Sequence, residues 1–137
     1  MKKTQVMAEF FIRGDNFSPS MITKKLAITP TRTYNKGDIL KYNKKGAIET
    51  VWEISTGYEE SFDINNQLTK IINLIKEKKD ILKKIKNRFH VDFGFNVVIE
   101  IRNGETPAVH WNKDIIGFAN EIGAEFDCDL YIIDGEV

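Results

Sequence analysis

The chain has 137 residues, of which 29% are charged and 42% hydrophobic, and its 20 Lys/Arg balance its 20 Asp/Glu. This length suits a single domain over residues 1–137 with one hydrophobic core. No run approaches the ~18 apolar residues of a membrane-spanning helix, and the single cysteine excludes an internal disulfide. We therefore expect a cytoplasmic protein with no membrane partner.

Charge is distributed unevenly along the chain. Residues 1–88 carry 18 Lys/Arg against 10 Asp/Glu, whereas residues 89–137 carry 2 against 10. Complementary charge raises association rate and selectivity. We expect a binding surface either in the basic 31–45 region or at an acidic edge near the C-terminus, unless the opposite charges neutralise each other within the fold.

The first strand is expected at residues 5–13, where apolar side chains alternate with others. Its core face would carry Val6, Ala8, Phe10 and Ile12, and its other face Gln5, Met7, Glu9, Phe11 and Arg13. The tripeptide Arg13-Gly14-Asp15 matches the integrin-binding sequence. We interpret it in this chain as residues suited to a turn.

A short helix should follow this strand. Ser18 is suited to its N-cap and Pro19 to its first position, where a missing N–H costs nothing. Ile22 and Leu26 would form its apolar face. Pro30 should terminate it, because a residue before proline is disfavoured in helical conformation.

Several of these features, with later ones, match a family pattern. They are Gly14-Asp15, Phe17-x-Pro19, Ile22-Thr23, Leu26, Ile28-x-Pro30-Thr31, Lys36-Gly37-Asp38, Trp52-x-Ile54, Ile122-Gly123-Ala124, Asp127, Asp129 and Tyr131. Over nearly its whole length the chain resembles the bacterial family of unknown function DUF4279. The resemblance implies a small α+β domain of unassigned activity and supplies no catalytic residue. The family is expected to have glycine at the position of Ala27. Because this chain has alanine there, we expect its helix exit to be less tight than in the family.

The polar segment 31–38 is the leading candidate for a binding site. Its hydroxyl, guanidinium and ammonium donors suit an anion or a carboxylate-bearing partner. They belong to Thr31, Arg32, Tyr34 and Lys36. The alternative is a fixed connector in which Arg32 pairs with an acid such as Asp38 and Tyr34 is half-buried.

Residues 39–42 and 48–56 are expected to form a hairpin around the turn Asn43-Lys44-Lys45-Gly46. Ile48, Thr50, Trp52 and Ile54 would share its core face, and Gly57 would be the hinge of the next loop.

The longest expected helix runs from 64 to 88 behind an Asp63 N-cap. Its apolar stripe has helical spacing and comprises Ile64, Leu68, Ile71, Ile75, Leu82, Ile85 and Phe89. The opposite face is basic, with Lys70, Lys76, Lys79, Lys83 and Lys86. We interpret this face mainly as a solvated one, with nucleic-acid binding as the alternative.

The last third predicts a strand, a helix and a strand. Alternation is nearly strict over 91–102, and Asn112 and Gly123 suit the ends of a helix at 113–122. In the strand 125–133, Phe126, Cys128, Leu130 and Ile132 would face the core and Asp127 and Asp129 the other side. The order β-α-β-α-β-α-β predicts an α+β domain with a four- to five-stranded, mainly antiparallel or mixed sheet, three helices on one face, and a partly wet second face.

Candidate catalytic groups are few. His90 and His110, together with Asp92, Asp127 and Asp129, could form a metal site or an acid–base pair, but no spacing forces them together. We expect no cofactor and no metal. Cys128 on an apolar face suggests a buried small side chain rather than a nucleophile.

These observations favour a cytoplasmic, non-catalytic protein-interaction module of the immunity or accessory type, with Thr31, Arg32, Tyr34, Lys36, Asp127 and Asp129 as candidate contacts. The alternative is a protein that binds an anionic small molecule or nucleic acid through the 31–45 loop and the lysine-rich helix. A third class is an enzyme that uses His90 and His110 with aspartates. The oligomeric state is not predicted.

Overall fold

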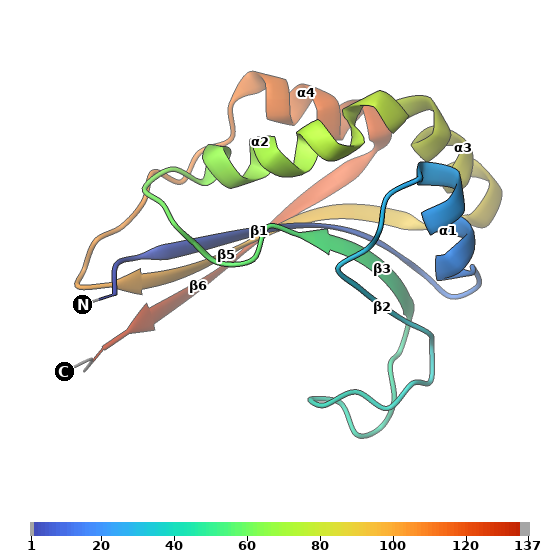
Figure 1. Ribbon diagram of the computed structural model, residues 1–137, viewed down its shortest axis with the longest axis horizontal. Helices are drawn as coiled ribbons and strands as arrows, with labels where there is room; N and C mark the ends of the chain where they lie inside the picture. The colour runs from blue at the N-terminus through green and yellow to red at the C-terminus, as the bar shows by residue number, and fades with distance from the viewer. Residues whose placement is uncertain (1, 135–137) are drawn as a thin grey trace.

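All helices of the described chain lie on one face of a six-stranded sheet (Figure 1). The structure, a computed structural model, describes residues 2–134. The predicted domain therefore extends beyond them only by Met1 and residues 135–137. The strands are β1 (Gln5–Gly14), β2 (Arg32–Tyr34), β3 (Thr50–Ser55), β4 (Glu59–Glu60), β5 (Asp92–Arg102) and β6 (Ala124–Ile133). The helices are α1 (Pro19–Leu26), α2 (Ile64–Ile75), α3 (Lys79–Phe89) and α4 (Lys113–Ile122), with a short 3₁₀ helix at Lys76–Lys78.

The strand order is β2-β3-β1-β5-β6, with β4 also paired to β1. The β5–β6 pair is parallel, because α4 carries the chain back across the sheet, and the other pairs are antiparallel. The predicted α+β class and the mostly antiparallel sheet are confirmed. Residues 2–134 hold slightly more strands than expected, since β2 and β4 lie in segments that we had assigned to loops.

The core lies between the sheet and the helices, as the alternation predicted. Val6, Ala8, Phe10 and Ile12 of β1 are fully buried on the helix side. Phe93, Phe95, Val97 and Ile99 of β5 extend the same layer. The helices cover it with Ile22, Leu26, Ile64, Leu68, Ile71, Ile75, Leu82, Ile85, Ile115, Ala119 and Ile122.

The predicted helix at 64–88 is one helical segment with an internal break. The 3₁₀ turn separates α2 from α3, and Ile75 and Leu82 on either side of it stay fully buried. Asp63 caps α2 as predicted, accepting a hydrogen bond from the backbone N–H of Asn65 at 2.9 Å. Asn112 likewise caps α4, and Gly123 ends it at φ 71°.

The ends of α1 differ from the prediction. Ser18 occupies the N-cap position, but its side chain makes no capping hydrogen bond; its Oγ lies 2.9 Å from Ser20 Oγ. Ala27 ends the helix in the left-handed region at φ 54°. Alanine thus adopts the backbone conformation for which the family pattern led us to expect glycine.

The predicted hairpin of 39–42 with 48–56 is wrong. The partner of β3 is β2, with Arg32 opposite Glu53 and Tyr34 opposite Val51. Residues 39–42 form no strand, because the 35–49 segment closes on itself instead of running along β3. Ile48, expected in the core, is exposed as a result, whereas Trp52 and Ile54 are buried as predicted.

The predicted core face of β6 is correct only in its first half. Phe126 and Cys128 pack against the core, but Leu130 and Ile132 are exposed. The reason is that β6 is an edge strand whose last part runs away from the helical layer (Figure 1). Within residues 2–134, no helix is both long and apolar enough to cross a membrane.

Candidate functional site

The sheet face opposite the helices, here called the open face, carries most of the predicted site residues. Strand register aligns one residue from each of five strands in a row across it. That row is Arg32 of β2, Glu53 of β3, Phe11 of β1, Gly94 of β5 and Glu125 of β6. Charged residues thus occupy both ends of this row, with Phe11 and Gly94 between them, whereas the opposite face is apolar.

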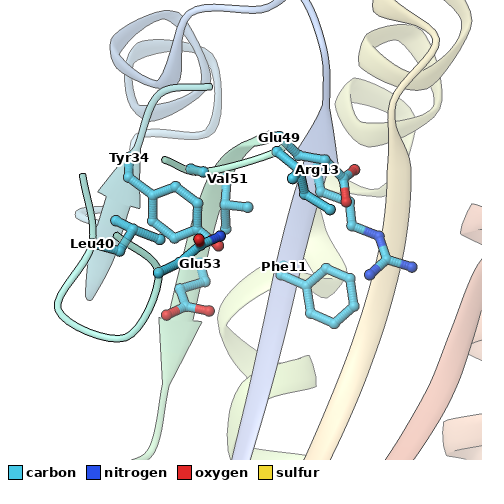
Figure 2. Close-up of a pocket in the computed structure, with 10 residues that line it drawn as sticks. Phe11, Arg13, Tyr34, Leu40, Glu49, Val51 and Glu53 are labelled. Atoms are coloured by element: carbon cyan, nitrogen blue, oxygen red, sulfur yellow. The ribbon is translucent and has the colours of Figure 1, made fainter. Parts of the chain in front are cut away.

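A pocket of about 220 Å³ lies between the open face and the 35–49 loop. Figure 2 shows the Tyr34 and Phe11 rings on either side, with Val51 and Glu53 between them. The sheet contributes Phe11, Arg13, Tyr34, Val51 and Glu53, and the loop contributes Leu40, Asn43, Ala47, Ile48 and Glu49.

The loop that covers this pocket is held by backbone hydrogen bonds. The N–H of Gly37 donates to the carbonyl of Ala47, and the N–H of Ala47 donates to the carbonyl of Asp38, both at 2.7 Å. At the base, the backbone N–H of Lys36 donates to Thr50 Oγ1 at 2.9 Å. The two backbone bonds join residues 37 and 38 to residue 47, so the segment between them is a closed loop. The loop therefore presents its side chains from a defined backbone.

One pocket wall depends on a glycine. The Phe11 ring lies over Gly94 so closely that a Cβ at position 94 would be 2.2 Å from Phe11 Cζ. The guanidinium of Arg13 also lies over the Phe11 ring, with 4.9 Å between its Cζ and the ring centroid. Gly94 thus lets Phe11 lie flat on the sheet beside the pocket.

Arg32 forms an ion pair that partly matches the connector interpretation. Its Nε lies 2.6 Å from Glu53 Oε1, so its partner is Glu53 and not Asp38. Only 11% of the Glu53 side chain is exposed, so the neighbouring guanidinium compensates a carboxylate that is largely removed from water. Arg32 also lies over the Tyr34 ring, with 5.3 Å between its Cζ and the ring centroid.

Tyr34 is half-buried, as the connector interpretation expected. Burial raises the pKa of its phenol; Glu53 and Glu49 raise it further, against the opposing effect of Arg32. At neutral pH the hydroxyl therefore keeps its proton. It can donate a hydrogen bond to a bound group.

Thr31 and Lys36 flank this site. Thr31 Oγ1 accepts a hydrogen bond from the backbone N–H of Ser55 at 2.9 Å, so this hydroxyl holds β2 in place. The ammonium of Lys36 is exposed and lies 3.4 Å from Asp15 Oδ1. Asp15 follows Gly14 in a bend, in agreement with the turn interpretation of the Arg13-Gly14-Asp15 tripeptide.

Asp127 and Asp129 are also on the open face, but at its other edge. Four strand spacings separate β2 from β6, which corresponds to about 19 Å. Asn96 Nδ2 donates to Asp129 Oδ2 and to Glu9 Oε1, each at 3.3 Å. Burial raises the pKa of Glu9, and Glu53 raises it further. The structure thus separates the candidate residues into two patches.

The two histidines lie at opposite ends of the α2–α3 segment. His110 Nε2 is 3.7 Å from Asp63 Oδ2 at the start of α2, whereas His90 ends α3 at φ 52°. Since α2 alone is about 18 Å long, these residues do not form a joint site. Among residues 2–134, no three His, Cys, Asp or Glu side chains are arranged to hold a metal ion.

Cys128 packs partly against the core. Burial raises the pKa of its thiol, and Asp129 raises it further, so less of the nucleophilic thiolate forms. This environment agrees with the interpretation of Cys128 as a small packing residue.

With this geometry, the chain can be compared with known proteins. A family model described as "Domain of unknown function (DUF4279)" matches residues 4–133. The chain belongs to the DUF4279 family. The same comparisons find no match among curated proteins or solved structures.

The sequence alone did not predict the pocket of this DUF4279 domain. Alternation had placed Phe11 and Arg13 on the outer face of the first strand, but their neighbours depend on strand order. Pairing of β1 with β3 brings Glu53 opposite Phe11. The 35–49 loop adds Leu40 and Ile48, which we had assigned to a hairpin.

Proposed function

We propose that this domain is a small, non-catalytic module of the bacterial cytoplasm that binds a protein partner, as immunity-type or accessory proteins do. The observation that supports this function most is the surface of the 35–49 loop. Ile39, Tyr42 and Ile48 are 71%, 89% and 76% exposed. Single exposed apolar residues are common, but a group on one hydrogen-bonded loop is typical of an interaction surface.

Charge indicates what kind of partner fits the loop. The loop carries four lysines, at positions 36, 41, 44 and 45, against Asp38 and Glu49. A partner with an apolar patch surrounded by acidic residues would match both features. Such complementarity chiefly raises the association rate and the selectivity.

The pocket beside the loop provides an anchor point. Its volume of about 220 Å³ is below the roughly 300–1,000 Å³ typical of small-molecule pockets. It therefore suits one partner side chain better than a drug-sized ligand. The Tyr34 hydroxyl and the Arg13 guanidinium are donors at this position.

The test is a quantitative comparison of partners retained by the wild-type protein and by loop variants. Tagged protein is exposed to native cytoplasm, and retained proteins are measured by mass spectrometry. The double variant Tyr42→Ser/Ile48→Ser should lose the partner, whereas Leu74→Ser should keep it, because Leu74 is an exposed apolar residue on the opposite side of the sheet. Equal retention by all three proteins would contradict the proposal.

The charge contribution needs a second variant. Arg32→Glu is unsuitable because it would remove the counter-ion of the largely buried Glu53. Lys41→Glu/Lys44→Glu leaves the sheet untouched and should slow association severalfold, with a melting temperature near that of the wild type. Unchanged association kinetics would show that loop charge has no part in binding.

Anion binding is a second candidate, because the helical side is strongly basic. Residues 76–88 carry seven Lys/Arg against Glu77 and Asp80. A groove of about 340 Å³ between α1 and α3 has an apolar floor surrounded by Lys25, Lys84 and Arg88. The 35–49 loop lies on the other side of the sheet, so loop and helix form no continuous basic surface (Figure 1). Binding of a single-stranded oligonucleotide that weakens steeply with salt and is lost in Lys84→Glu/Arg88→Glu would favour this function.

A further inference from the structure

Strand β6 leaves one edge of the sheet without a neighbouring strand. It pairs with β5 on one side, and no strand within residues 2–134 pairs with its other side. It is ten residues long. An edge strand has unpaired backbone N–H and C=O groups, which can hydrogen bond to an additional strand. Natural edges are usually short, bulged or covered, and β6 is a regular ladder along its whole length.

The helix side of this edge is apolar and open. A shallow groove of about 420 Å³ runs beside it, lined by Trp111, Ile116, Phe126, Asp127 and Cys128. Farther along the same side of β6, Leu130 and Ile132 are 59% and 72% exposed. Side chains of an added strand that point toward the helices would cover this apolar surface.

The open-face side of the same edge is acidic. Glu125, Asp127 and Asp129 occupy alternate positions of β6 and are all exposed. Side chains of an added strand that point toward the open face would therefore meet a row of carboxylates. Directly opposed unlike charges stabilise a strand pair, and like charges destabilise it.

We propose that the β6 edge binds an extended segment of a partner protein by strand addition, and that this segment alternates basic and apolar residues. The two-residue period of a strand places every second side chain on the same face. Lysines or arginines would then face the three carboxylates while the intervening apolar residues cover Leu130, Ile132 and the groove. A second copy of this chain fits less well, because it brings its own three acids to the edge.

This site is distinct from the proposed contact of the 35–49 loop. It lies at the opposite edge of the sheet, about four strand spacings or 19 Å away. The two surfaces can therefore be tested independently. Loss of binding at one does not imply loss at the other.

The experiment uses the full-length protein and two synthetic peptides that match β6 in length. One alternates lysine with valine or isoleucine, and the control has the same composition with lysines grouped at one end. Fluorescence anisotropy should show at least about tenfold tighter binding of the alternating peptide. Amide exchange should slow at alternate residues of β6 and nowhere on β2. Equal affinity for both peptides would overturn the proposal.

Substitutions test whether the alternating peptide binds at the β6 edge. Leu130→Lys and Asp127→Lys/Asp129→Lys should each weaken binding of the alternating peptide by about tenfold or more. Leu74→Lys, at an exposed apolar position on α2 away from β6, should leave it unchanged. Retention of wild-type affinity in the β6 variants would overturn the proposal. The proposal would also be overturned if light scattering showed that the wild-type protein is a dimer and that Leu130→Lys is a monomer. In that case a second copy of the chain would occupy the edge.

Discussion

The indole N–H of Trp52 donates a hydrogen bond to Thr23 Oγ1 at 3.0 Å and so joins β3 to α1. Trp52 is fully buried among the core residues of the helix side. We predict that Trp52→Ala costs about 3–5 kcal/mol, because truncation of a buried aromatic leaves a cavity. Urea unfolding followed by circular dichroism measures this loss, and a variant of wild-type stability would contradict the packing described.

Thr23→Val is the matched control for this contact. It keeps the shape of the side chain and leaves the indole N–H without its acceptor, which should cost about 1–3 kcal/mol. The loss should be smaller than that of Trp52→Ala. If the two losses were equal, the hydrogen bond and not the packing would dominate at this position.

A second prediction concerns Ala27, which adopts φ 54° at the C-terminus of α1. The left-handed region is unfavourable for an L-residue with a Cβ, and glycine carries no such penalty. Ala27→Gly should therefore stabilise the protein by about 0.5–1 kcal/mol despite the greater freedom of glycine in the unfolded chain. Thermal unfolding should show a higher melting temperature.

Gly123→Ala tests the same principle in the opposite direction. Gly123 ends α4 at φ 71°, and an added Cβ would lie 2.9 Å from Lys86 Nζ. The substitution should lower the melting temperature. If Ala27→Gly lowered it as well, the exit of α1 would have to depend on a contact of the Ala27 methyl group.

A third prediction compares two N-cap positions. Asp63 accepts a hydrogen bond from Asn65 N–H, whereas the Ser18 side chain makes no capping bond. Asp63→Ala should cost about 0.5–2 kcal/mol and Ser18→Ala only a few tenths. Denaturant midpoints of the two variants give the comparison. Equal losses would show that Ser18 caps α1 in solution.

These two caps show how far local sequence patterns reach. Residue type identified Ser18, Asp63 and Asn112 as N-caps, and hydrophobic periodicity identified the buried faces of β1, β5 and the helices. Both signals depend on near neighbours in the chain. Whether the Ser18 hydroxyl turns toward the helix or toward Ser20 depends on one rotamer, which residue type does not determine.

Long-range pairing was beyond the reach of the sequence patterns. Short polar β2 has too few residues to show alternation, and its assignment as a strand comes from its register with β3. That register sets Arg32 beside Glu53 and creates the pocket. The exposure of Leu130 has a similar cause, because alternation predicts which side a residue faces but not whether a helix covers it.

A fourth prediction concerns the contact of Phe11 with Gly94. An added Cβ at position 94 would lie within 3 Å of three atoms of the Phe11 ring, so the ring must move. Gly94→Ala should cost about 1–3 kcal/mol, as overpacking does elsewhere. The double variant Gly94→Ala/Phe11→Ala should lose less than the sum of the two single variants. Strict additivity in a double-mutant cycle would contradict this contact.

The last prediction concerns the pH dependence set by Glu9. Burial and Glu53 raise its pKa above the ordinary value of 4.5, so the folded state favours the protonated carboxyl. Glu9 therefore contributes stability that is fully present below its unfolded pKa and is lost as the pH rises through the raised folded pKa. Glu9→Gln stays neutral and can still accept the Asn96 hydrogen bond. At pH ~7 the variant should melt above the wild type, and this difference should disappear toward pH ~4.

Asp63→Asn is the control of opposite sign, because the Asn65 hydrogen bonds lower the pKa of Asp63. Its stability deficit should be present at neutral pH and shrink as the pH falls through the range in which Asp63 protonates. If Glu9→Gln instead melted below the wild type at neutral pH, the ionised carboxylate would have to be a net stabilising group on the open face.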